Sequence, residues 1–247
     1  MQKDFYATYF DVEKTHWLMR GRRAIVLDML SRFAPAGGAV LDFGCGSGLT
    51  VDTVARAGYR ASGVDFSKEA IDFGAAKGIR GLQTVSEEKL PYADNSFDAV
   101  LCMDVLEHLA DETTALSEMR RVLKPGGALI IMVPAYMFLW GKQDEVAHHF
   151  RRYTMSSLQT LLRRNGDYRI LKRSYFNTVL FPAVAMIRFT SRFFGIGVSR
   201  ESDFDLNSPL INIACGSIFA AERAGLRFLS YPFGVSILLA VRNQKKV

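Results

Sequence analysis

The sequence predicts an α/β protein built on a seven-stranded, mostly parallel sheet with helices on both faces. The first reason is the run Val40–Phe43, an apolar segment followed at once by alternating glycines. Such a run is typical of a buried parallel strand that ends in a tight turn. The second reason is the order of later segments, which indicates β-α-β-α-β-β-α-β. In such a sheet ligands bind at the carboxyl ends of the strands, where the glycine turn falls.

The remaining elements follow from apolar periodicity, capping residues and turn signals. Ser67 and Thr154 each precede a helical pattern and are typical N-cap residues. Gly58 and the pair Asn165-Gly166 mark helix ends. We expect the later strands at 59–64, 82–85, 97–103, 128–133, 168–175 and 233–241, and helices at 49–57, 111–123, 154–165, 178–194 and 209–224.

The same pattern divides the chain into four segments. Residues 1–33 form N-terminal lid or cap helices, and 34–175 form the Rossmann-like core. Residues 176–232 form a helical insertion rich in phenylalanine and arginine, and 233–247 supply the last strand of the core. Three readings of the insertion stay open: a lid packed on the sheet, a surface for membrane or lipid tails, and a dimer contact.

Composition limits the class of protein. The 247 residues suit one α/β domain with an insertion, and 49% hydrophobic residues can fill its core. Three cysteines argue against a disulfide scaffold. We expect no signal peptide and no spanning helix, because no apolar stretch approaches about 20 residues. The net charge of +6 favours anionic partners without choosing among phosphates, lipids and nucleic acid.

The glycine turn predicts a nucleotide-like ligand. Its spacing is G-x-G-x-G from Gly44 to Gly48, with Asp42 before it. The dinucleotide fingerprint does not fit, because its third glycine would fall at Leu49 or Val51. Asp65 ends the second strand about 20 residues later, where an acidic side chain meets ribose hydroxyls in βαβ nucleotide sites.

Together with three later stretches, this turn resembles the class I S-adenosylmethionine (SAM)-dependent methyltransferases, in particular the methyltransferase type 11-like group. Residues 90–98 resemble the L-P-F-x-D-x-S-F-D segment of that group, and 123–127 resemble its L-K-P-G-G run. Residues 13–23 and 148–154 are similar to a branch associated with lipid and polysaccharide modification. The resemblance implies SAM as cofactor and an antiparallel final pair of strands.

The resemblance also implies a set of cofactor contacts. Arg22 would reach the carboxylate of SAM, Phe66 would pack on the adenine, and the segment that follows the fourth strand, at Met103, would line the methionine. An acidic residue that often bonds the adenine amino group is replaced here by Ser86, so Glu87 beside it is our choice. The full set is Arg22, Asp42, Gly44, Gly46, Gly48, Asp65, Phe66, Glu87 and Met103.

The acceptor site is expected in the loop after the fifth strand. This loop is aromatic at 135–141 and basic at 148–153. His149 could take a proton from a substrate hydroxyl, because imidazole titrates near neutral pH. Arg151 and Arg152 could clamp a phosphate or carboxylate. With Tyr136 and Tyr153 they form the expected substrate site, and the alternative is a solvated basic loop.

A metal is not expected. Asp104, Glu107 and His108 could meet on one helical face and hold a divalent cation. Ubiquinone-type O-methyltransferases resemble this stretch and use a metal nearby. Most members of the resembled family carry Glu-His without one, and we interpret the pair as a support for the loop.

The sequence therefore predicts an enzyme that moves a methyl group from SAM to an oxygen or nitrogen of a small, lipid-like or anionic acceptor. The alternatives are an RNA methyltransferase and a non-catalytic methyltransferase-fold scaffold. Nucleic acid is disfavoured, because no RNA-binding module is evident. We expect a cytoplasmic protein and leave open association with the inner face of the membrane and formation of a homo-oligomer.

Overall fold

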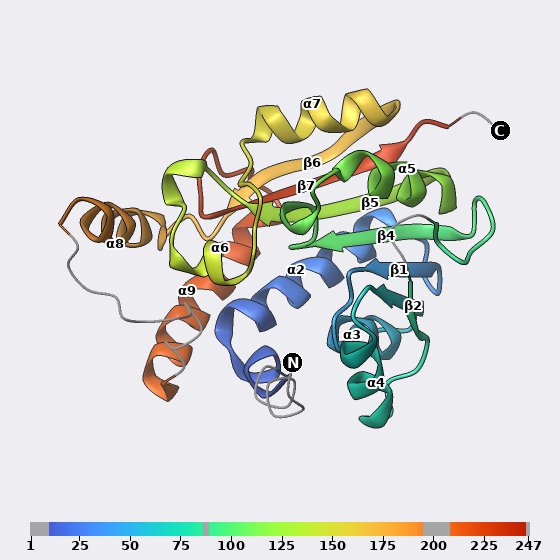
Figure 1. Cartoon of the computed structure of the whole chain (residues 1–247), viewed down its shortest axis with the longest axis horizontal. Helices are drawn as coiled ribbons and strands as arrows, with labels where there is room; N and C mark the ends of the chain where they lie inside the picture. The colour runs from blue at the N-terminus through green and yellow to red at the C-terminus, as the bar shows by residue number, and fades with distance from the viewer. Residues whose placement is uncertain (1–9, 86–88, 195–207, 246–247) are drawn as a thin grey trace.

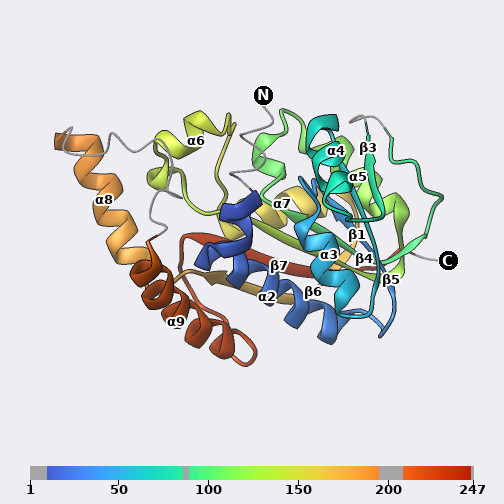
Figure 2. The same cartoon turned by 90° about the horizontal axis from the view of Figure 1, so that it is seen from below.

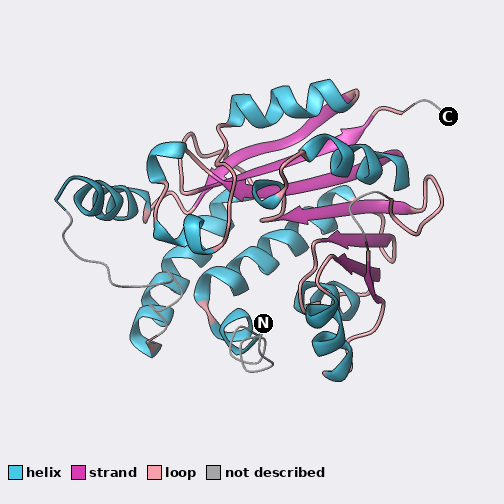
Figure 3. Ribbon diagram, viewed as in Figure 1, coloured by secondary structure: helices cyan, strands magenta, loops and turns pink. Residues whose placement is uncertain are grey.

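A computed structural model describes residues 10–85, 89–194 and 208–245, and it contains the predicted seven-stranded sheet (Figures 1 and 3). The strand order is β3-β2-β1-β4-β5-β7-β6. All neighbouring pairs from β3 to β5 are parallel, whereas β7 is antiparallel to both β5 and β6. The strands are β1 (Ala39–Phe43), β2 (Arg60–Asp65), β3 (Leu82–Thr84), β4 (Phe97–Met103), β5 (Leu123–Pro134), β6 (Tyr168–Phe176) and β7 (Ser236–Asn243).

Helices cover both faces of the sheet, as the alternating pattern predicts. Figure 1 shows α2, α3 and α9 below the sheet and α5 and α7 above it. The helices are α2 (Trp17–Phe33), α3 (Leu49–Arg56), α4 (Lys68–Ala76), α5 (Glu112–Val122), α6 (Lys142–Val146), α7 (Met155–Asn165), α8 (Phe181–Phe194) and α9 (Pro209–Leu226). Short 3₁₀ turns, η1 (Leu106–His108) and η2 (Met137–Leu139), follow β4 and β5.

Two apolar layers hold the helices on the sheet. On one face α2 and α9 bury Ile25, Met29 and Phe219 against β-strand residues such as Ile130. On the other face α5 and α7 pack on a second buried cluster. Burial of such side chains stabilises by about 1.5–3 kcal/mol each. These layers fix the strand ends that carry the site.

Local signals explain most element boundaries. Ser67 accepts a hydrogen bond from the amide of Ala70 and caps α4, and Thr154 accepts one from Ser157 and caps α7. The predicted start of the fifth strand at residue 128 is wrong: α5 ends at Val122 and β5 begins at Leu123. Leu123 pairs with Phe97 across a register shift, so the Lys-Pro-Gly-Gly stretch runs extended within β5.

Helices α8 and α9 both lie between residues 176 and 232, and they extend beyond the sheet (Figure 2). The last strand begins at Ser236, three residues later than predicted, and Phe233 before it is 42% exposed. Within the described residues, no helix has the length and apolar character that crossing a bilayer requires.

Candidate functional site

The glycine turn joins β1 to α3 and leaves its backbone open to a ligand. Gly44, Gly46 and Gly48 have φ values of +77°, +55° and +84°, a region that L side chains rarely adopt. A Cβ at Gly44 would lie 2.3 Å from the Val105 side chain, so this position requires glycine. A Cβ at Gly46 would meet nothing within 4 Å. The middle of the turn therefore faces open space.

Asp65 lies beside this turn, as predicted. It ends β2, and its two carboxylate oxygens accept hydrogen bonds from the amides of Gly46 (2.7 Å) and Ser67 (2.9 Å). These bonds hold the carboxylate at the carboxyl end of β2 while leaving lone pairs for ligand hydroxyls. Phe66 packs edge-on against Phe43, with ring centroids 5.8 Å apart. Glu87 lies outside the described residues.

Asp42 is buried beneath the turn with an unsatisfied oxygen. Asp42 is 3% exposed, and its Oδ1 accepts no hydrogen bond from any of the described residues. Burial, together with the nearby carboxylates of Glu13 and Asp65, raises the pKa of Asp42 to about 8. Such an orphaned polar atom fits a site whose ligand supplies the missing partner.

The N-terminal segment closes over the same turn. The Ser47 hydroxyl donates to Glu13 Oε2 over 3.1 Å, and Glu13 Oε1 lies 4.0 Å from Nη1 of Arg23. Burial raises the pKa of Glu13, while Arg23 and Ser47 oppose that rise. Glu13 was not predicted as a site residue, because nothing in its local sequence points to a partner 34 residues away.

Arg22 and Met103 lie near the end of β4. Arg22 forms an ion pair with Asp104 and donates to Ser236 Oγ at 3.3 Å. Met103 is the last residue of β4, and Asp104 follows it with φ +52°. Arg22 thus reaches the ligand end of the sheet, but its partner in this structure is Asp104.

On the acceptor side, His149 is oriented by a buried carboxylate. Asp144 has a fully buried side chain, and its Oδ1 lies 2.9 Å from His149 Nδ1. Burial alone would raise the pKa of Asp144, but hydrogen bonds from His149 and Arg152 hold it at about 2. Because Asp144 is ionised, His149 Nδ1 carries the proton of this bond, which leaves Nε2 as the basic nitrogen.

Both arginines of the predicted clamp have acidic partners in the structure. Arg152 places Nε and Nη2 on Asp144 at 2.7 and 3.0 Å, and its side chain is 7% exposed. Arg151 pairs with Glu112 and donates to the carbonyl of Ala110. The sequence showed two adjacent cations but not the acidic partners that fold back to them. Both arginines brace the loop in this structure.

The two predicted tyrosines also differ in position. Tyr153 is 4% exposed and donates to Glu112 Oε1 at 3.0 Å, so in this structure it braces the loop from within the core. Tyr136 stacks on Tyr175 with centroids 5.2 Å apart and on Phe138 at 5.1 Å. Tyr136 therefore belongs to an aromatic wall at the carboxyl end of β5.

Three donors could hold a divalent cation, but they are not the three that the sequence suggested. Ligand atoms of Glu107, His108 and His149 lie within 4.8 Å of one another. Asp104 is instead paired with Arg22. Glu107 is fully buried, and among the described residues neither of its carboxylate oxygens is hydrogen-bonded. Burial and the Asp104 carboxylate raise the pKa of Glu107 well above its usual range.

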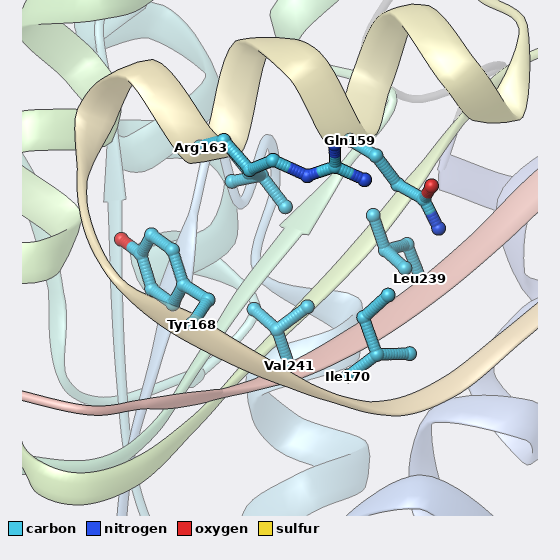
Figure 4. A pocket seen from close by; sticks show the side chains of 7 residues that line it. Gln159, Arg163, Tyr168, Ile170, Leu239 and Val241 are labelled. Atoms are coloured by element: carbon cyan, nitrogen blue, oxygen red, sulfur yellow. The ribbon is translucent and has the colours of Figure 1, made fainter.

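A separate depression lies between α7 and the sheet (Figure 4). Its lining includes Gln159, Arg163, Tyr168, Ile170, Leu239 and Val241. Tyr168 begins β6, which runs parallel to β1, so this depression lies toward the amino ends of the parallel strands. It is remote from the glycine turn and takes no part in the site.

Comparison with known proteins agrees with this geometry. Residues 41–131 match the family model described as "Methyltransferase domain". The chain contains a class I methyltransferase domain. Domains of this class take S-adenosylmethionine as methyl donor, and the open turn, Asp65 and the orphaned oxygen of Asp42 fit that ligand.

Relatives of the methyltransferase domain include ubiquinone biosynthesis O-methyltransferases. That of Xanthomonas oryzae pv. oryzae is 32% identical over 130 residues, 50% of this chain and 54% of the relative. That of Xylella fastidiosa is 36% identical over 112 residues, 42% of this chain and 46% of the relative. The chain thus spans about half the length of the curated relatives it matches.

Solved structures share the fold along nearly the whole chain. A chain of the complex between the Haloferax volcanii Trm112 methyltransferase activator and a protein described as a methyltransferase has a TM-score of 0.63 at 20% identity, covering 99% of this chain and 96% of its own. An S-adenosylmethionine-dependent methyltransferase from Mesorhizobium loti has a TM-score of 0.57 at 16% identity, covering 89% and 98%. The [4+2]-cyclase SpnF has a TM-score of 0.56 at 22% identity, over 90% of this chain and 80% of its own. The same fold therefore also carries other chemistry.

Proposed function

We propose that the chain transfers the methyl group of SAM to an oxygen or nitrogen atom of a small acceptor. The observation that carries this proposal is the open backbone at Gly46 beside the fixed carboxylate of Asp65. The family match at residues 41–131 covers both the glycine turn and β2, and it supports the same proposal. A scaffold without a cofactor would have no need for an open turn at this edge of the sheet.

For this reaction the protein mainly has to align the acceptor atom with the methyl group, exclude water and accept one proton. When bound, SAM supplies an electrophilic methyl group on a positively charged sulfur. The acceptor atom forms the new bond to carbon as the carbon–sulfur bond breaks, and a neutral thioether remains. His149 Nε2 takes the proton that a hydroxyl acceptor loses, with Asp144 fixing the ring.

The acceptor is proposed to be lipid-like. Large apolar side chains are exposed on η2, α8 and α9. Met137, Phe138, Met186, Phe189, Leu210 and Ile213 are each more than half exposed. The relatives from Xanthomonas oryzae and Xylella fastidiosa are named for ubiquinone biosynthesis, which supports an acceptor with an apolar part. Exposed apolar side chains in such number are typical of lipid or partner contacts.

SAM titration by calorimetry tests the cofactor. We expect wild-type binding, and Asp65→Ala should weaken it by about 1–3 kcal/mol, because the ligand hydroxyls lose their carboxylate partner. Asp72→Ala on the exposed side of α4 is the control and should leave the affinity unchanged. If wild type binds no SAM, the proposed function fails.

Liposome flotation tests the acceptor class. We expect binding to vesicles that contain anionic lipid, and turnover of an apolar hydroxylated acceptor presented in them. Replacing Met186 and Phe189 with Ser should reduce flotation and leave SAM affinity intact, because both side chains point away from the core. Turnover confined to water-soluble acceptors, without vesicle binding, would contradict a lipid-like acceptor.

A further inference from the structure

The depression between α7 and the sheet has an apolar floor. Leu162 lines it from α7, and Ile170, Leu239 and Val241 line it from β6 and β7 (Figure 4). Together with the solvent at its mouth it encloses about 290 Å³. This volume is close to the lower end of the range of about 300–1,000 Å³ that small-molecule sites have. The depression therefore has room for a short apolar chain.

Two polar side chains of α7 lie at the rim of this depression. Gln159 and Arg163 are four residues apart and share a face of the helix. Figure 4 shows the guanidinium of Arg163 extending toward Gln159 along the side of α7 that faces the sheet. The Nε2 atom of Gln159 is buried and has no hydrogen-bond partner among the described residues. Buried donors normally have an acceptor, and an oxygen atom of a ligand would supply one here.

Arg163 lacks the acidic partner that other arginines of the chain have. Arg151 and Arg152 on the acceptor loop each pair with a carboxylate. Arg163 makes no ion pair or hydrogen bond within the part of the chain that the structure describes. Residues 155–173 carry five cations, and their one carboxylate is that of Asp167. This local excess of positive charge favours a ligand with a negative group.

A second arginine reaches the same place from α5. The guanidinium carbon of Arg120 lies 5.9 Å from the centre of the Tyr168 ring, which lines the depression. The Nε atom of Arg120 is buried and, like the hydroxyl of Tyr168, has no partner among residues 10–85, 89–194 and 208–245. Gly166 leaves room for Arg120, because a Cβ there would lie 2.3 Å from that Nε atom. Cations from two helices thus border one apolar hollow.

We propose that this depression is a second binding site, which takes a small carboxylate that carries a short apolar chain. The carboxylate accepts charge-assisted hydrogen bonds from Arg163 and from the amide of Gln159, and the chain covers the apolar floor. The depression lies toward the amino ends of the parallel strands, whereas the glycine turn lies at their carboxyl ends. A ligand bound here therefore does not compete with SAM, and the inference is independent of the proposed function.

Titration of octanoate into the wild-type chain, followed by the NMR shifts of backbone amides, tests the site. We expect saturable shifts centred on residues 159–170. Octan-1-ol has the chain without the charge, and acetate has the charge without the chain, so each should bind at least about tenfold more weakly. Saturating octanoate should leave the SAM affinity of the same sample unchanged.

Three substitutions locate the two halves of the ligand. Arg163 and Arg164 are adjacent and both exposed on α7, but Arg164 does not line the depression. Arg163→Gln should weaken octanoate binding about fivefold, and the matched control Arg164→Gln should weaken it less than about twofold. Ile170→Ser, at an exposed position of the floor, should weaken octanoate binding about threefold and leave acetate unaffected.

Four results would overturn the inference. Wild type could fail to bind octanoate, or the two arginine substitutions could weaken binding equally, which would indicate a general attraction to positive charge. Shifts centred on α8 and α9 would place the chain on the exposed apolar side chains of those helices. Displacement of SAM by octanoate would place the ligand at the glycine turn.

Discussion

At the scale of single residues, Asp144 is the buried charge on which the acceptor loop depends. It accepts hydrogen bonds from His149, Arg152 and the amide of Gly141. Asp144→Ala should lower the free energy of unfolding by about 3–5 kcal/mol, because Arg152 is left as an uncompensated buried charge. Urea denaturation measures this loss. Asp72→Ala, which removes an exposed pair with Lys68, should change stability by less than about 1 kcal/mol.

Asp144 also determines how the stability of the protein changes at acidic pH. The pKa of Asp144 is held at about 2, below its ordinary value near 4. Its contribution to stability is therefore present above pH 4 and is lost as the pH falls through about 2. Asp144→Asn should flatten this part of the stability profile. A wild-type slope retained in Asp144→Asn would show that another carboxylate is responsible.

Residues fixed by backbone demands were predictable, and residues fixed by distant partners were not. The alternating glycines and Asp65 follow from turn geometry and strand order, and the structure places them together. Glu13 and Asp144 are ordinary acidic residues in their local sequence, and only tertiary contacts give them partners. The ion pairs of Arg151 with Glu112 and of Arg152 with Asp144 were not predicted either, because a pair of adjacent cations does not indicate which carboxylates will contact them.

At the scale of elements, Phe219 is one of the residues that anchor α9 to the body of the protein. Phe219 is 2% exposed and contacts Trp17 and Phe176 edge-on, with centroids 5.6 and 6.1 Å apart. Its ring also occupies the space beside Gly21 on α2. Phe219→Ala should destabilise the protein by about 3–5 kcal/mol in urea denaturation, because it opens a cavity between two helices.

Phe228 provides the matched control. It lies just beyond the end of α9 and is 87% exposed, so Phe228→Ala should change stability by less than about 0.5 kcal/mol. Equal effects of the two substitutions would mean that α9 is not held on α2 as described. Loss of stability without loss of SAM affinity in Phe219→Ala is expected, because the glycine turn lies on other elements.

Strand and helix positions were largely predictable, because apolar runs and caps are local signals. The pairing of Leu123 with Phe97 was not, since a Pro-Gly-Gly stretch reads as a stop and only the neighbouring strand shows that it continues as β5. The orientation of β7 came from family resemblance, because periodicity does not distinguish parallel from antiparallel pairing. The structure confirms an antiparallel β6–β7 pair.

At the scale of the whole molecule, the sheet brings β4, the acceptor loop and the cofactor turn to one edge, so alignment alone can carry the reaction. We expect turnover to survive chelation with EDTA, because SAM brings its own electrophile and His149 is already bonded to Asp144. A rate assay before and after chelation measures this. Loss of activity that Mn²⁺ or Zn²⁺ restores would make Glu107, His108 and His149 a metal centre.

The position of β7 has a consequence for synthesis on the ribosome. This strand comes after all the others in the chain, yet it lies between β5 and β6. Until residues 236–243 leave the exit tunnel, β6 has no neighbour and the edge of β5 stays unpaired. Domains generally fold as units as they emerge from the ribosome. The nascent chain therefore exposes unpaired backbone N–H and C=O groups along the edge of β5 until β7 has been synthesised. A chaperone that shields strand edges would act in that interval.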